Sequence, residues 1–395
     1  MRYFLVLGSL YAPVALTVSM STKTPHTRSF FYVGQQYEAI GGSNIARRQM
    51  YVEHLMPLRV RQPYPLLFIP GQGLIGTNFL DTPDGRPGWA DFFLAEGYEV
   101  YIVDPPCRGR SSWQKDADGP LTVFDVRRIE ERFTATRLHD LWPQAMLHTQ
   151  WPGNGTAGDT TFDNFYSSVF PHLRSNVEGA EKFKHAGSLL LDRVGDAILV
   201  THSHSGQYGW ILADARPRGV KAIVALEPLG PPFVDAVFPP FADARPFGLT
   251  DIPLEYDPPL PTASDLKKVE VASNPFLICY RQGEPPRKLK NLAEIPVLIV
   301  TSESGYHAIY DHCTTEYLRQ AGVKVDHVRL EEVGIHGNGH MMFMEKNNLD
   351  IARDVVQPWL ARRTAGLPAP STVSSLSMRR NQEDISDFIS TENEL

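Results

Sequence analysis

A serine lies in a tight polar turn between an apolar run and a helical pattern. The run Ala197–Val200 precedes His202-Ser203-His204-Ser205-Gly206, and Gln207–Ala213 is typical of a helix start. A strand, a sharp turn with a central serine and a helix form a nucleophile elbow, which exposes the serine hydroxyl above the sheet. The elbow needs small residues two before and two after the serine, and Thr201 and Ser205 meet that need without glycine. A polar loop after a buried strand is the alternative.

A serine hydroxyl attacks a carbonyl only when a base takes its proton and an acid orients that base. The best base is His340, in a glycine-rich loop after the last predicted strand, and His336 is its rival. Two acids are open: Glu227 ends the strand after the nucleophile helix, and Glu303 follows the next strand. The apolar residues before Glu227 predict burial, and a buried carboxylate needs a partner such as an imidazolium. This favours Glu227.

The oxyanion of a tetrahedral intermediate needs aligned N–H donors. The backbone N–H of His204, directly after the nucleophile, is one candidate. The second is the N–H of Gln72 in Pro70-Gly71-Gln72-Gly73, where glycines allow the backbone to approach a substrate. An ordinary glycine–proline turn is the alternative for this loop.

The histidines and cysteines do not predict a metal site. His202 and His204 point to opposite faces of an extended segment, and no spaced carboxylate or cysteine completes a ligand set. The cysteines (Cys107, Cys279 and Cys313) are far apart and fit neither a disulfide framework nor a zinc spacing. One pair could bridge in an oxidising compartment, but free thiols are the expectation.

Strands alternate with helices along most of the chain. Predicted strands cover 31–37, 49–55, 66–69, 98–104, 197–200, 220–226, 297–300 and 323–328, and helices cover 88–96, 207–213 and 349–361. This order predicts a mainly parallel sheet covered on both faces.

Two stretches interrupt the alternation. Residues 111–190 are rich in aromatic, charged and glycine residues, and residues 228–295 contain Pro-Pro pairs that exclude long regular elements. Both leave the sheet at the edge where α/β proteins bind ligands, so we expect a lid and a pocket wall. Surface decoration is the alternative.

The composition is that of a globular protein. The 395 residues are 42% hydrophobic and 21% charged, with a net charge of −7. They suit one large domain with insertions or two smaller domains. Without a block of Lys and Arg the chain is a poor candidate for binding nucleic acid, and no internal apolar run predicts a membrane span.

The two ends differ from the rest. Residues 1–21 have a short basic start, an apolar stretch and small residues, which predicts a secretory signal. Pro13 and the single positive charge weaken this prediction, and a cytoplasmic protein is the alternative. Asn154-Gly155-Thr156 is a glycosylation sequon if the chain is secreted. Residues 366–395 are polar and Ser-rich, so we expect a disordered tail.

Several blocks together resemble one branch of the α/β-hydrolase superfamily, which includes a bacterial periplasmic esterase and fungal relatives. The blocks are 82–89, 97–104, 108–111, the turn at 202–206 and the histidine segment 334–342. The resemblance covers about 30–362 and implies an α/β-hydrolase fold, with Glu227 as the acid. The bacterial relative has adjacent cysteines after the strand-three glycine, whereas Gln72-Gly73 stand here, which weakens the case for Gln72.

The hypothesis is a serine esterase with Ser203 as nucleophile, His340 as base and Glu227 as acid, and it requires no cofactor. The partner is a small-molecule ester, and the sequence leaves a homodimer open. The same triad could cleave a lactone, an amide or a C–C bond. A catalytically inactive binding protein with this fold is the remaining alternative.

Overall fold

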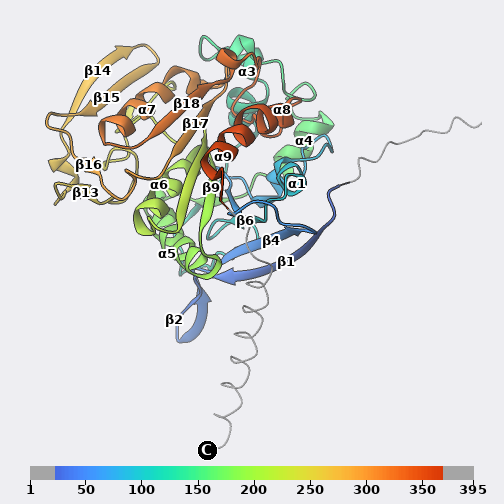
Figure 1. Ribbon diagram of the computed structural model, residues 1–395. Helices are drawn as coiled ribbons and strands as arrows, with labels where there is room; N and C mark the ends of the chain where they lie inside the picture. The colour runs from blue at the N-terminus through green and yellow to red at the C-terminus, as the bar shows by residue number, and fades with distance from the viewer. Residues whose placement is uncertain (1–22, 368–395) are drawn as a thin grey trace, which may run out of the picture.

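A computed structural model describes residues 23–367 and places an eight-stranded sheet at the centre (Figure 1). In spatial order its strands are β1 (His26–Val33), β4 (Met50–Pro57), β6 (Val100–Asp104), β5 (Leu66–Ile69), β9 (Ala197–His202), β10 (Val220–Leu226), β17 (Val297–Thr301) and β18 (Val325–Arg329). The strands from β6 to β18 run parallel, while β4 runs antiparallel to both β1 and β6. The prediction of a mainly parallel sheet is confirmed.

Helices cover both faces of this sheet, so its central strands read as continuous apolar runs. The helices are α1 (Trp89–Ala95), α2 (Val126–Ile129), α3 (Thr136–His139), α4 (Thr160–Ser167), α5 (Asn176–Val194), α6 (Gly206–Ala215), α7 (Asp311–Gln320), α8 (Asn348–Ile351) and α9 (Gln357–Thr364). One core lies between the sheet and α5, α6 and α7, and a second lies between the sheet and α1, α8 and α9 (Figure 1).

The predicted strands match the sheet best where both faces are buried. β5 and β10 have the predicted bounds. The first strand differs: β1 ends at Val33, because Gly34 has φ +81° and its backbone packs against Ala186. The chain then forms a separate hairpin of β2 (Gln36–Ile40) and β3 (Ser43–Arg47).

The last part of the 111–190 stretch differs from the lid that the sequence suggested. It forms the long helix α5, whose side chains Phe183 and Leu190 belong to the main core. The Ser175 hydroxyl caps it by accepting a hydrogen bond from Glu178 N at 3.2 Å. Lys182 lies on the buried face of this helix, where a charged residue is not expected from the sequence. Its charge is paired with Asp118 at 2.5 Å inside the protein.

The rest of both stretches contains strands, accompanied in the first stretch by α2, α3 and α4. The strands are β7 (Leu121–Thr122), β8 (His172–Leu173), β11 (Val234–Asp235), β12 (Ala242–Asp243), β13 (Tyr256–Asp257), β14 (Lys268–Asn274), β15 (Leu277–Gln282) and β16 (Lys288–Leu289). The β14–β15 hairpin is more regular than predicted, because the Pro-Pro pairs lie outside it.

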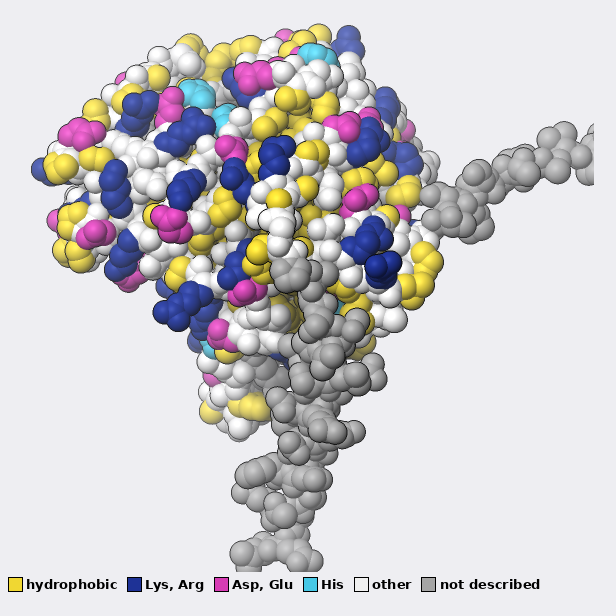
Figure 2. Space-filling view, viewed as in Figure 1, with side chains coloured by type: hydrophobic (Ala, Val, Ile, Leu, Met, Phe, Trp, Pro, Cys, Tyr) yellow, Lys and Arg dark blue, Asp and Glu magenta, His cyan; other side chains and the backbone are white. Residues whose placement is uncertain are grey.

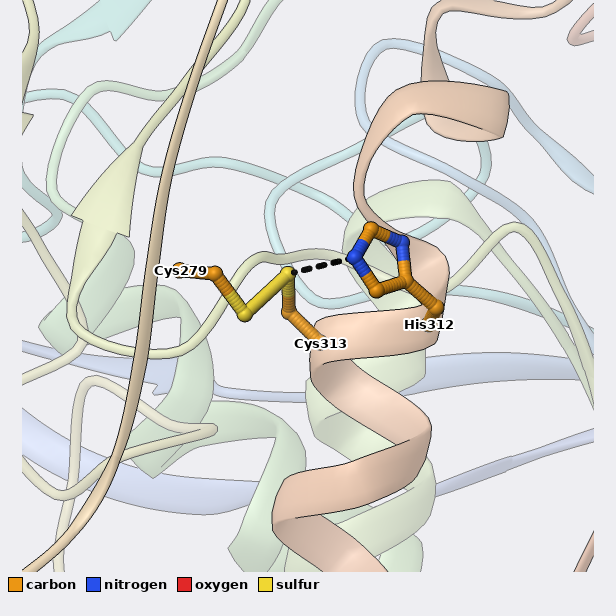
Figure 3. Close-up of side chains that lie close together, drawn as sticks. All are labelled: Cys279, His312 and Cys313. Carbon is orange, nitrogen blue, oxygen red and sulfur yellow. Dashed lines mark hydrogen bonds between the residues drawn. A yellow bond between two sulfur atoms is a disulfide. The ribbon is translucent and has the colours of Figure 1, made fainter. Parts of the chain in front are cut away.

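Cys279 of β15 and Cys313 of α7 form a disulfide, so the expectation of free thiols was wrong for this pair (Figure 3). The two residues are 34 positions apart, but the hairpin packs beside α7 and brings their Cα atoms to 5.7 Å. His312 Nε2 lies 3.5 Å from Cys313 Sγ. Cys107 is a buried free cysteine, as expected.

Basic and acidic side chains are interspersed on the face shown in Figure 2. Within residues 23–367, no helix combines the length and the apolar character that crossing a membrane would require. The predicted signal sequence (1–21) and nearly all of the predicted tail (366–395) lie outside the described residues.

Candidate active site

Ser203 lies at the turn between β9 and α6 with φ +56°, a left-handed conformation that costs energy for a residue with a side chain. The hydroxyl of Ser205 braces the turn: it accepts a hydrogen bond from His202 N at 2.9 Å and donates to Ile69 O at 2.6 Å. The strand, sharp turn and helix have the geometry of a nucleophile elbow.

The glycines that this turn lacks are found on α6 instead. A Cβ at Gly209 would lie 3.1 Å from Thr201 Cγ2, and a Cβ at Gly206 would lie 2.5 Å from Pro228 Cβ. Because Gly209 has no side chain, α6 packs close to the sheet and still leaves space for the methyl group of Thr201.

His340 and Glu227 form a buried pair at the same edge of the sheet. The two atoms His340 Nδ1 and Glu227 Oε2 are 2.6 Å apart, with side chains 1% and 0% exposed. Glu227 directly follows β10, the neighbour of β9, and has φ +43°. The backbone N–H of Ser302 donates to Glu227 Oε1 at 2.8 Å, and the Ser302 hydroxyl donates to the same oxygen.

Burial governs the charges of this pair. It lowers the pKa of His340 well below the ordinary value, and the neighbouring His307 lowers it further. Burial raises the pKa of Glu227 to about 7, while His307 and the Ser302 hydrogen bonds oppose the rise. A neutral His340 is thus held with Nδ1 on the carboxylate. Its Nε2 atom is buried and has no hydrogen-bond partner within the described part of the chain.

Tyr306 connects this pair to the serine. Its ring centroid lies 5.0 Å from that of His340. Burial raises the pKa of Tyr306, while the charge of Arg132 and, less strongly, the Ser203 hydroxyl oppose the rise. Ser203 and His340 therefore border the same phenol.

The rival residues form a different pair. His336 Nδ1 lies 3.0 Å from Glu303 Oε1, and Gly337 N donates to Glu303 Oε2 at 2.7 Å. The side chain of His336 is 62% exposed, in contrast with that of His340. The structure thus joins His336 to Glu303 and His340 to Glu227.

Buried hydrogen bonds fix the loop that carries His340. Glu345, which is fully buried, accepts from Gly339 N at 2.9 Å and from Asn338 Nδ2 at 2.9 Å. His148 Nε2 lies 2.7 Å from the same carboxylate. The His202 Nε2–H donates to the carbonyl of His340 at 2.9 Å, so the turn and the loop are directly connected.

The two predicted oxyanion residues lie on either side of Asn176 at the start of α5. Asn176 Oδ1 lies 3.4 Å from Gln72 Nε2 and 3.2 Å from His204 Nε2. Arg108 stabilises the loop that carries Gln72, because its guanidinium donates a hydrogen bond to Gly71 O at 2.6 Å. A Cβ at Gly71 would lie 3.1 Å from Ser203 Cβ, so this loop passes directly beside the serine.

His307 is a site residue that the sequence did not single out. Its ring stacks on that of His340 at 4.7 Å between centroids, with 11° between the planes. Its Nδ1 lies 3.0 Å from Asp311 Oδ1, and its Nε2 lies 2.9 Å from the Tyr310 hydroxyl. Burial lowers the pKa of His307 to about 4. A histidine and an aspartate four positions apart were the available signal, although they lie on two elements: His307 is in the 3-10 turn Tyr306–Ile309 and Asp311 begins α7.

Glu227, His307 and His340 bring possible metal-ligand atoms within 4.8 Å of one another, a cluster that the sequence did not predict. All of these donors except His340 Nε2 are already engaged by other protein groups in the described residues. Glu227 and His340 bind each other, and both ring nitrogens of His307 have partners. The arrangement suits proton transfer better than metal binding.

Comparisons with known proteins agree with this architecture. A model of the alpha/beta hydrolase family matches residues 66–354. A curated relative from Fungal sp. (strain ATCC 74256), the probable secreted lipase phiG, is 50% identical over 338 residues, which cover 85% of this chain and 90% of the relative. A solved structure described as a novel bacterial esterase has a TM-score of 0.56 and 23% identity, over 91% of this chain and 100% of that one. The chain therefore belongs to the alpha/beta hydrolase family.

Proposed function

We propose that this protein is a serine hydrolase that cleaves carboxylic esters through Ser203, His340 and Glu227. The observation that carries the proposal is the buried imidazole of His340, which has one nitrogen on a carboxylate and the other unpartnered within residues 23–367. Its loop is hydrogen-bonded to the strand-to-helix turn that carries Ser203. This is the arrangement that turns a weak alcohol into a nucleophile.

The reaction proceeds in two halves. Ser203 Oγ attacks the ester carbonyl while His340 Nε2 takes its proton, and the N–H groups of Gln72 and His204 stabilise the oxyanion. The imidazolium then gives that proton to the departing alcohol, which leaves an acyl-enzyme. Water attacks the acyl group, His340 takes one proton from it, and the acid is released as Ser203 recovers its hydrogen. Glu227 keeps His340 in the required tautomer throughout.

Two further points favour an ester as substrate. The 50% identical relative is named a lipase, and no member of the candidate triad is missing, as it would be in an inactive binding protein. The same chemistry applies to lactones, amides and certain C–C bonds, so a panel of these substrates beside simple esters identifies the scissile bond.

A fluorophosphonate probe tests the nucleophile. Wild-type protein should be labelled at Ser203 and should hydrolyse a p-nitrophenyl ester. Ser203→Ala should lose labelling and reduce kcat by at least about 10³-fold with unchanged thermal stability. Ser167→Ala, on the exposed surface of α4, is the matched control. An unlabelled wild type, or activity retained in Ser203→Ala, would refute the proposal.

We also propose that the protein is secreted. A buried disulfide is typical of proteins that fold in an oxidising compartment, and the relative is named as secreted. Asn154 is exposed, and its Oδ1 accepts hydrogen bonds from Thr156 N and Oγ1, both at 2.9 Å. Protein from the native host's medium should lose mass on deglycosylation, and Asn154→Gln should remove that change. Protein found only inside the cell would contradict secretion.

A further inference from the structure

Aromatic side chains from both insertions extend outward from His340 and Tyr306. Phe133 stacks on His340 with 5.2 Å between ring centroids. Trp142 and Phe238 lie 5.9 Å and 5.4 Å from the ring of Tyr306. These four residues, Phe133, Trp142, Phe238 and Tyr306, are called the aromatic wall below.

The positively charged side chain of Arg132 packs against this aromatic wall. The guanidinium of Arg132 lies over the ring of Phe238, 3.9 Å from its centroid, and the side chain is only partly exposed. Arg132 and Phe133 are neighbours in a single π-helical turn (Glu130–Thr134), a distortion that is common at functional sites. This turn therefore places Phe133 against the imidazole of His340 and Arg132 against the ring of Phe238.

Arg132 has no anionic partner among residues 23–367, although acids lie close to it. Glu131 pairs with Arg127 at 2.5 Å, and Asp235 pairs with Arg245 at 2.8 Å. Burial lowers the pKa of Arg132 and nearby Arg128 adds to this, while Tyr306, Glu131 and Asp235 oppose it. The guanidinium is therefore partly desolvated and its donors have no protein acceptor in the described part of the chain, which leaves them available to a ligand.

We propose that Arg132 binds a carboxylate of the substrate, so that the preferred ester carries a free carboxylate group. A guanidinium presents two parallel N–H donors that match the two oxygens of a carboxylate. Stacking on Phe238 holds its plane and leaves the edges free for such a contact. Arg132 is therefore a specificity-determining residue, and the inference rests on the proposed esterase activity.

A pair of esters of one dicarboxylic acid tests this. Monomethyl adipate carries a carboxylate at neutral pH, and dimethyl adipate does not. Arg132→Gln should lower kcat/KM for the monoester by about 10- to 100-fold, chiefly through KM, and change the diester by less than about 3-fold. Arg132→Lys should retain part of the preference. Arg137→Gln, at an exposed position of α3 in the same insertion, is the control and should change neither.

Equal losses for both esters in Arg132→Gln would overturn the proposal, because a purely structural role predicts them. A binding measurement tests the role of Arg132 independently of the proposed esterase activity. Monomethyl adipate should bind to Ser203→Ala in calorimetry, and the additional Arg132→Gln change should weaken that binding by about 10-fold or more. If the wild type hydrolyses no ester, the proposed function fails and this binding result alone decides the role of Arg132: unchanged binding overturns it.

Discussion

Gly305 lies against the carboxylate of Glu227. A Cβ at position 305 would stand 2.6 Å from Glu227 Oε1, 2.8 Å from Oε2 and 2.5 Å from Ser302 Oγ. The segment after β17 therefore shapes the environment of an acid that belongs to another strand.

Gly305→Ala should displace Glu227 from His340. We expect kcat to fall by about 10²-fold, since small errors in the placement of catalytic groups are expensive, and stability to fall by about 1–3 kcal/mol. Steady-state kinetics and denaturant unfolding measure these effects. Gly219→Ala is the control, because a Cβ there would have its nearest neighbour at 3.6 Å. Full activity in Gly305→Ala would mean that Glu227 is not the acid or does not need this position.

Glu227→Gln and Glu303→Gln discriminate between the two candidate acids. Loss of the carboxylate at Glu227 should lower kcat by about 10³- to 10⁴-fold, because a neutral amide permits the wrong tautomer of His340. Glu303 serves the exposed His336, so its substitution should change kcat by less than about 3-fold. A larger loss at Glu303 would reverse the assignment.

The pH dependence should follow Glu227. Its buried carboxyl has a pKa raised to about 7, so it becomes protonated as the pH falls through that value and can no longer accept from His340 Nδ1. The pKa of His340 is lowered, so its own protonation comes at more acid pH. We expect kcat/KM to fall below about pH 7 in wild type and in Glu303→Gln alike. A rate that stays constant well into the acid range would contradict this.

The disulfide should contribute to stability rather than to chemistry. The double variant Cys279→Ala/Cys313→Ala should lose about 2–4 kcal/mol of unfolding free energy, since the bridge closes a loop between β15 and α7. Its kcat at low temperature should stay within about 3-fold of wild type. Reductant should destabilise the wild type and leave the double variant unchanged. Equal effects of reductant on both proteins would assign the effect to another group.

The sequence predicts the parts of the molecule that depend on local patterns. Apolar runs such as 66–69 and 220–226 predict central strands of a parallel sheet that is covered on both faces. The turn at Ser203 and the pairing of Glu227 with His340 follow from strand ends meeting at one sheet edge. Family resemblance was still needed to choose between Glu227 and Glu303.

Other features depend on contacts that no local pattern reveals. The buried face of α5 is concealed by Lys182, whose charge is neutralised by Asp118, a residue 64 positions away. The partners Cys279 and Cys313 meet only because a hairpin folds against α7. Arg132 looks like an ordinary surface cation until Phe238 is placed under it. Long-range packing decided each of these.

The transfer of glycine from the serine turn to α6 has a practical consequence for sequence searches. A motif scan that demands Gly-x-Ser-x-Gly overlooks this chain, although Ser203 lies at a strand-to-helix turn with φ +56°. Gly206 and Gly209, three and six positions downstream of Ser203, carry the steric requirement instead. A pattern that also accepts glycine at those two offsets would include this chain.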